Sequence, residues 1–243
     1  MIKIYLLALL FSSFLCSDTI GGEASIGFSY HSIEGSSRYN TLGSIDLVDT
    51  LDFSSSQDIF LKAYIEHPFP LFPNVKLGYT AFSYDASSLV SSFSWGDIQN
   101  FTGKLDNSLS LNYTDATLYY ELLDNWAEID TGFTFRYLKG DMSINSTFKS
   151  DAVSYTSLVP MLYGKARLNI PATDLSVQAE VNLMSLSGIT AYDYELSARY
   201  SFTMGVGIEA GYKTFHLDSD DLVDGLNTNI DISGPYVSAV WDF

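Results

Sequence analysis

The sequence predicts an all-β protein, a transmembrane antiparallel up-and-down β-barrel of about 10 strands. Residues 235–243 alternate, with Trp241 and Phe243 on the apolar face, and a period of two indicates a β-strand. The 243 residues are 47% hydrophobic and 15% aromatic, yet no apolar run approaches the roughly 20 residues of a transmembrane helix. An export signal opens the chain. Together these features are typical of a barrel whose apolar residues face lipid at alternate positions.

Residues 1–17 are predicted to be a cleavable signal peptide. Lys3 precedes a nearly continuous apolar run over residues 4–15, which Cys16 and Ser17 end. Such a run is too short to span a bilayer and fits a signal peptide. We expect cleavage after Cys16 or Ser17, leaving residues 18–243 as one barrel domain. A lipoprotein signal is the lesser alternative, because Leu15 stands where a small residue is needed.

Composition excludes several classes of function. The formal net charge is −17, which argues against nucleic-acid binding, since that requires a basic face. Cys16 is the only cysteine, so a mature chain cleaved after it has no disulfide and no thiolate metal site. Neither a phosphate-cradling glycine loop nor another cofactor motif is present, and we expect no cofactor and no metal.

Strands are predicted wherever side chains alternate between apolar and polar. The clearest segment places Ile129, Phe133 and Phe135 on one face, with Asp130 and Arg136 on the other. The predicted strands cover residues 23–33, 59–66, 75–81, a segment ending at 121, 127–137, 158–168, 175–183, 194–200, 204–212 and 235–243. An even number of strands places both chain ends on the periplasmic side. Eight strands is the alternative if one hairpin is misread.

A soluble β-sandwich also has alternating strands and is the competing fold. It buries its apolar face between two sheets and shows polar residues to water. Neither an export signal nor a strand that ends on an aromatic residue is needed for such a fold. The barrel is therefore the preferred prediction.

A rigid periplasmic turn is predicted after the second strand. Proline cannot continue a hydrogen-bonded ladder, and three prolines fall within six residues here. The predicted turn contains His67, Pro68, Pro70, Pro73 and Asn74. We expect His67 to fix this turn through hydrogen bonds.

Longer outer loops are expected where serine, glycine and aspartate accumulate. The first predicted loop ends near residue 57. Three further loops are predicted to cover residues 85–106, 139–154 and 217–226. The last contains Asp218, Asp220, Asp221 and Asp224, and carboxylates on a flexible loop can hold Ca²⁺. The spacing is not that of an EF-hand, so a solvated acidic loop is the preferred interpretation. Cations bridging this loop to lipopolysaccharide are a further hypothesis.

The polar faces of the predicted strands carry a set of charged side chains expected to point into the lumen. This set contains Lys62, Glu66, Lys76, Asp115, Glu121, Glu128, Asp130, Arg136, Lys165, Arg167, Glu180, Glu195, Arg199, Glu209 and Lys213. Buried charges are costly unless they are paired and hydrogen-bonded. Both signs are well represented, so we expect a network of ion pairs that fills a narrow lumen.

Three functions remain open at this point. A plugged barrel with a structural or loop-displaying role is preferred. A small ion or solute channel with a charged constriction is the alternative. An outer-membrane hydrolase or acyltransferase is the third, because His31 and His216 fall near the outer ends of strands. Such an enzyme needs a nucleophile, a base and an orienting group to converge, and no G-x-S-x-G motif is present.

Three segments resemble a family of proteobacterial outer-membrane barrels marked by a Gly-Gly pair near the mature N-terminus. They are Gly21-Gly22-Glu23, residues 66–74 (EHPFPLFPN) and residues 115–125 (DATLYYELLDN). The resemblance implies a barrel in the outer membrane, in contact with its lipid and lipopolysaccharide, and no assigned activity. It also implies insertion by the barrel-assembly machinery, which would read Val237, Ala239, Trp241 and Phe243. A monomer is expected.

Overall fold

The computed structural model describes residues 21–40, 43–69, 71–186, 188–223 and 225–243. The predicted signal peptide lies outside these residues, as does Pro70 of the predicted turn. Regular structure in the described part of the chain consists of 11 strands and one short 3-10 turn. No helix in the same part is long and apolar enough to cross a membrane.

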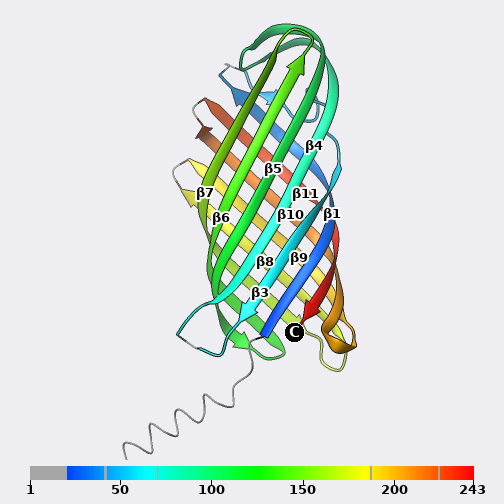
Figure 1. The fold of residues 1–243 in the computed structure, drawn as a ribbon, viewed down its shortest axis with the longest axis vertical. Coiled ribbons are helices and arrows are strands. Elements are labelled where there is room, and N and C mark those ends of the chain that lie inside the picture. Colours follow the sequence, from blue (N-terminus) through cyan, green and yellow to red (C-terminus); the bar gives the residue numbers. More distant parts are fainter. Residues whose placement is uncertain (1–20, 41–42, 70, 187, 224) are drawn as a thin grey trace, which may run out of the picture.

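The strands form one closed antiparallel sheet (Figure 1). Their bounds are β1 (Gly21–Tyr39), β2 (Ile45–Asp46), β3 (Ser56–Glu66), β4 (Asn74–Trp95), β5 (Ile98–Asp124), β6 (Ala127–Ser146), β7 (Ser150–Asn169), β8 (Leu175–Leu186), β9 (Ile189–Ser201), β10 (Val206–Val223) and β11 (Leu226–Asp242), with the 3-10 turn η1 at Thr203–Gly205. Strand β11 pairs with β1 and closes the barrel. Strand β2 pairs only with Ser36 and Ser37 of β1, so 10 strands form the wall, as predicted.

The outward face of the barrel is apolar near the end where β1 begins and β11 ends, which we call the terminal end. Phe28 on β1, Phe133 on β6 and Val237 on β11 all point outward and are exposed. Outward tyrosines such as Tyr137 and Tyr212 follow at the far edge of this apolar surface. An apolar band bordered by aromatic rings is what a lipid-facing barrel surface requires.

The polarity of the two faces reverses partway along the strands. On β5, the inward side chains of Asp115 and Thr117 are buried polar groups, whereas inward Leu111 is buried and apolar. The outward face changes in the opposite direction, from Leu118 to Ser110. A strand surrounded by lipid places apolar side chains outward, and the same strand surrounded by water places them inward. Each long strand therefore passes from one solvent into another.

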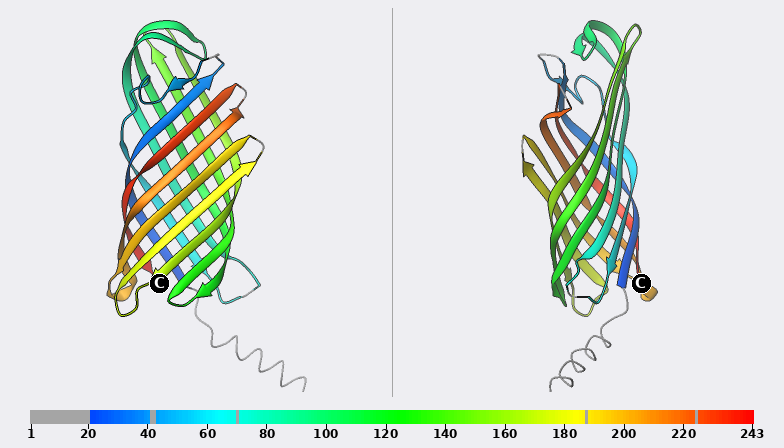
Figure 2. Two further views of the ribbon diagram at one scale, coloured as in Figure 1. Left: turned by 180° about the vertical axis from the view of Figure 1, so that it is seen from behind. Right: turned by 60° about the vertical axis from the view of Figure 1, so that its left-hand side comes forward.

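The same reversal occurs on β6, where inward Arg136 is followed by inward Leu138 and outward Tyr137 is followed by outward Lys139. We call the part of the molecule beyond this change the distal head. It rises unevenly, because β4 to β7 are much longer than β8 and β9 (Figure 2). The distal head thus has the polarity of a water-soluble β-protein built on a membrane barrel.

The predicted outer loops at 85–106, 139–154 and 217–226 are wrong. Strands β4 and β5 fill the first region almost completely, β6 and β7 the second, and β10 and β11 the third. Strand β1 likewise continues to Tyr39 instead of ending near residue 33. The error has a physical cause: serine, asparagine and aspartate are abundant there because the outer face meets water, while apolar residues keep alternating on the inner face.

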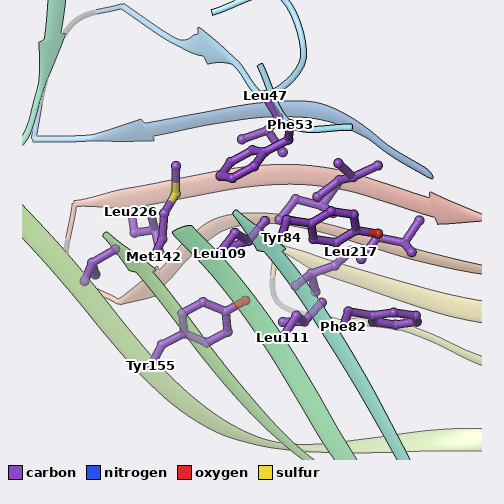
Figure 3. Packing of buried hydrophobic residues seen from close by; sticks show 14 of the residues in the cluster. Leu47, Phe53, Phe82, Tyr84, Leu109, Leu111, Met142, Tyr155, Leu217 and Leu226 are labelled. Carbon is purple, nitrogen blue, oxygen red and sulfur yellow. The ribbon is translucent and has the colours of Figure 1, made fainter. Parts of the chain in front are cut away.

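The segment 43–55 folds into the distal head and completes its core. Leu47 and Phe53 are buried against residues of the surrounding strands (Figure 3). Leu51 is buried in the same cluster. Asn107 on β5 donates from Nδ2 to the Leu51 carbonyl at 2.9 Å. Asp46 accepts hydrogen bonds at Oδ1 from two backbone amides of the turn that follows. This segment is therefore a packed plug and not an open loop.

The predicted turn between β3 and β4 is held by His67 and Asn74. His67 Nε2 lies 3.1 Å from the Pro73 carbonyl, and its Nδ1 accepts from the Phe69 amide at 3.2 Å. Asn74 Oδ1 accepts from the His67 amide at 3.1 Å. Both ring nitrogens of His67 thus make contacts within the turn, as a role in fixing it requires. Pro68 lies between these contacts.

Candidate functional site

The charged lumen at the terminal end is the candidate functional site. Most of the predicted lumen residues are buried: Lys76, Asp115, Asp130, Arg136, Lys165, Glu180, Glu195, Arg199, Glu209 and Lys213. Four are partly buried, namely Lys62, Glu66, Glu128 and Arg167. Glu121 is exposed at the terminal rim, where its Oε1 accepts from Asn74 Nδ2 at 2.9 Å. Strand alternation alone thus brings side chains from eight different strands into one interior.

Arg136 on β6 forms the layer next to the distal head. Its Nε and Nη2 donate to both carboxylate oxygens of Asp115, at 2.8 and 2.6 Å. Its Nη1 lies 2.6 Å from Oδ2 of Asp193 on β9. The guanidinium also lies 3.9 Å from the ring centroid of Tyr113. Two carboxylates and an aromatic ring therefore surround this buried cation, which is the arrangement that makes a buried charge tolerable.

Glu180 lies at the centre of the next layer. It forms an ion pair with Lys76 and accepts at Oε2 from the Tyr64 hydroxyl at 2.7 Å. The hydroxyl of Tyr163 is 3.5 Å from the same oxygen. Lys165 lies 4.7 Å from the Tyr64 ring and pairs with Asp130 at 3.2 Å. Tyrosine rings thus fill the space between the ion pairs.

A second cluster in this layer joins Lys62, Glu195 and Glu209. Lys62 Nζ donates to Glu195 Oε1 at 2.6 Å. The Tyr236 hydroxyl lies between the two carboxylates, 2.6 Å from Glu195 and 2.8 Å from Glu209. The sequence-based set of lumen residues did not include Tyr236. Its position between Pro235 and Val237, which lie on the apolar face of the last strand, predicts an inward side chain.

Glu23 binds two arginines at the terminal end of the lumen. Its carboxylate accepts from Arg199 Nη1 and Nη2, each at 2.7 Å, and from Arg167 Nη2 at 2.8 Å. Arg199 also donates from Nε to Glu209 at 3.0 Å. Glu23 follows directly on the Gly21-Gly22 pair of β1. This carboxylate therefore links the first strand of the barrel to β7 and β9, and Arg199 extends the link to Glu209 on β10.

The sequence-based set omitted Glu23 and Asp193 for different reasons. Glu23 is the first residue of the strand predicted at 23–33 and is in register with its inward positions, but it was not included among the lumen charges. Asp193 fell just before the strand assigned to residues 194–200, whereas β9 begins at Ile189 in the structure. Extending the alternation of that strand by a single pair of residues would have identified Asp193 as inward-facing.

Lys213 differs from the other lumen cations. Its side chain is buried, yet among the described residues no carboxylate lies within 4.0 Å of its amine. The amine instead lies 4.3 Å from the ring centroid of Phe60. Phe60 closes the lumen on the β3 side, so an aromatic face takes the place of a carboxylate.

Little free space remains within the charged layers. A cavity of about 30 Å³ lies among residues that include Arg136, Lys62 and Lys213, which is the volume of one water molecule in the liquid, about 30 Å³. A wider cup of about 440 Å³ opens at the terminal rim, lined largely by carboxylates such as Glu66, Glu121 and Asp242.

The two histidines considered for catalysis lie in different environments. His31 is buried, with Nδ1 2.5 Å from the Tyr84 hydroxyl and Nε2 3.2 Å from Asp58. His216 points outward and lies 2.7 Å from Asp231, stacked on Tyr192. Among the hydrogen bonds between described residues, none joins a serine hydroxyl to either ring. No group of described residues has the arrangement needed to hold a metal ion.

Comparisons with known proteins identify the fold. No protein-family model matches the chain, and no curated protein matches it. Among solved structures, the outer membrane protease OmpT from Escherichia coli is similar, at a TM-score of 0.58 and 11% identity, covering 94% of this chain and 99% of that one. The Neisseria meningitidis autotransporter NalP translocator domain has a TM-score of 0.46 at 14% identity, covering 100% and 95% of the two chains. Ail of Yersinia pestis has 0.40 at 13%, covering 91% and 99%. The chain has the closed, 10-stranded fold of an outer-membrane β-barrel.

Proposed function

We propose that the protein is an integral outer-membrane barrel with a plugged lumen that displays its distal head outside the cell. By the usual orientation of such barrels, with chain ends and short turns in the periplasm, the terminal end is periplasmic. The observation that carries the proposal is the filling of the interior by two successive layers. Ion pairs and tyrosines occupy the membrane part, and an apolar core that includes Leu47, Leu51 and Phe53 occupies the distal head.

Each layer resists ion passage for a different reason. In the charged layers, Arg136 and Glu180 use their hydrogen-bonding groups on protein partners, so few are left to solvate a passing ion. In the distal head, an ion would have to leave water for an apolar core. The free energy of that transfer is far larger than the free energy of unfolding of a protein. A small channel, the alternative, would need a continuous wet path through both layers.

Single-channel recording in a planar bilayer tests this proposal. We expect folded wild-type protein to stay silent, and Arg136→Ala to stay silent as well, because the apolar layer still seals the barrel. Combining Arg136→Ala with Leu47→Ser, Leu51→Ser and Phe53→Ser should open both layers and produce current. Discrete openings of the wild-type protein, with an ion selectivity that changes in Arg136→Ala, would instead support the channel.

The proposal includes no enzymatic activity. His31 is enclosed by Tyr84 and Asp58 inside the core, where a substrate has no room. His216 is held against Asp231 on the outer wall, without a hydroxyl nucleophile among its contacts in the described chain. The likeness to a protease concerns the fold and places no catalytic residue in this chain.

We propose a monomer in contact with outer-membrane lipid and lipopolysaccharide. The exposed side chains of Val237, Ala239 and Trp241 on β11, and of Phe243 directly after it, form one row that we place against lipid. This row is the segment that the barrel-assembly machinery would read. Replacing Phe243 by serine should lower the amount of inserted protein in cells, and unchanged insertion would remove Phe243 from that signal.

A further inference from the structure

A cleft of about 880 Å³ opens at the rim of the distal head. It lies between the end of β1, the beginning of β11, the plug segment and the β4–β5 hairpin. Its volume is within the range of about 300–1,000 Å³ that is usual for small-molecule sites. The cleft belongs neither to the charged lumen nor to the apolar core.

The walls of the cleft are joined by specific contacts. The tip of the β4–β5 hairpin reaches the end of β1, where the Gly96 amide donates to the Tyr39 carbonyl at 2.9 Å. Trp95, which is fully buried, packs on Tyr39 with ring centroids 5.1 Å apart. The Asn40 amide donates to the Gly225 carbonyl at 3.1 Å. These contacts hold three separate stretches of chain in place around the cleft, which is the preorganisation that a binding site needs.

The cleft has an unusual chemistry for so acidic a protein. The described lining side chains include the amides of Asn40, Gln99 and Asn227 and several hydroxyls, and none of them is a carboxylate. By contrast, a neighbouring cleft of about 470 Å³ on the other side of the plug is lined by Asp49 and Asp52. Amides and hydroxyls both donate and accept hydrogen bonds, and this capacity suits a ligand that carries many hydroxyl groups.

Arg38 is the charged group of this cleft. It lines the cleft from β1, opposite Asn227 of β11, and it forms no ion pair or hydrogen bond within the described chain. The lumen arginines are all engaged with carboxylates, so this guanidinium differs from Arg136, Arg167 and Arg199. A free guanidinium offers a fork of donors that matches a carboxylate. Screening over about 8 Å at physiological ionic strength keeps the distant negative charges from cancelling it.

We propose that this cleft binds a short saccharide that carries a carboxylate, with Arg38 on the carboxylate and the amides on the hydroxyl groups. The inference rests on the proposed function only in placing the distal head outside the cell. Phe93, which is 2% exposed and belongs to the apolar core, forms part of the floor of the cleft and leaves its walls to the polar groups. A neutral sugar would make the amide contacts alone and bind more weakly.

Saturation-transfer NMR on the folded full-length barrel in detergent micelles tests the proposal, with glucuronic acid and glucose as probes. We expect saturable binding of glucuronic acid and weaker binding of glucose. Arg38→Gln should weaken glucuronic acid binding by about tenfold, the loss of one charge-assisted hydrogen-bonded contact, and leave glucose binding unchanged. Lys104→Gln is the matched control, because Lys104 is an exposed cation outside this cleft.

Three outcomes would overturn the inference: no saturable binding of glucuronic acid, equal binding of the two sugars, or equal weakening by Arg38→Gln and Lys104→Gln. Heat-dependent migration in gels would establish that each variant is folded. Single-channel recording tests the plugged barrel separately, so failure of the cleft to bind sugar would not contradict the proposal that the lumen is plugged. Current through the wild-type barrel would overturn the plug without affecting the sugar site.

Discussion

Gly22 and Phe243 join the two edges of the barrel at its terminal end. Each donates its backbone amide to the carbonyl of the other, at 2.8 Å in both directions. The Phe243 ring lies over Gly22 so closely that a Cβ there would be 2.7 Å from two of its carbons. Glycine at this position therefore lets the last residue of the closing strand cover the first strand.

Gly22→Ala should destabilise the barrel by about 1–3 kcal/mol, the usual cost of forcing an extra carbon into a packed contact. Gly21→Ala is the matched control, since a Cβ there meets its nearest atom at 3.5 Å, an ordinary contact. Urea unfolding in lipid vesicles measures both. In a Phe243→Ala background the penalty at Gly22 should fall, because the obstructing ring is gone and the Tyr64 carbonyl, 3.2 Å from the added Cβ, is the remaining close neighbour. An undiminished penalty there would show that the ring is not its cause.

Glu23→Ala should destabilise the barrel by about 3–5 kcal/mol, since it leaves one buried and one partly buried guanidinium short of a partner. The affected groups are Arg167 and Arg199. Glu34→Ala removes a carboxylate from the exposed face of the same strand and should change stability by less than about 0.5 kcal/mol. Similar midpoints for both variants in urea would mean that the Glu23 contacts contribute little to folding.

Phe133→Arg should cost about 2–4 kcal/mol if it lies near the bilayer midplane. Asn145→Arg places the same charge on the outward face of the same strand, in the distal head, where water solvates it. That control should be close to neutral. Urea unfolding of the protein in lipid vesicles measures the stability of both variants. Equal losses of stability would contradict the placement of the membrane boundary between these positions.

Leu111→Ala should cost about 2–5 kcal/mol, because it opens a cavity in the apolar core. Leu89→Ala, at a side chain that is 85% exposed, should change stability by less than about 0.5 kcal/mol. Thermal unfolding, combined with protease digestion of the distal head, measures the stability of both variants. If Leu111→Ala is as stable as the control, the distal head lacks the packed core described above.

Much of the fold could be predicted from the sequence because the information was local. Alternation along a segment such as residues 127–137 shows both the strand and its two faces, since side chains in a strand point alternately to opposite sides. The prolines around His67 likewise identify a turn without reference to distant residues. The strand count and the direction of nearly every predicted lumen charge depend on this local periodicity alone.

The extent of the strands was harder to predict because the solvent changes along them. An apolar residue such as Leu105 was read as part of a polar loop, since the prediction assumed that apolar side chains always point outward. Once water replaces lipid, the same alternation has the opposite meaning. A search for alternation of either sign would have recovered β5 and β6 in full.

The sequence by itself determined that the chain alternates, that its strands carry charges of both signs on one face, and that an apolar row ending in two aromatic residues closes the chain. Only the tertiary structure decided which charges meet, as Arg136 meets Asp193 and Glu23 meets Arg199. It also decided that residues 43–55 enter the core. Strand periodicity is a property of neighbours in the chain, whereas these contacts depend on barrel closure, which brings residues as distant in sequence as Glu23 and Arg199, or Gly22 and Phe243, within hydrogen-bonding distance.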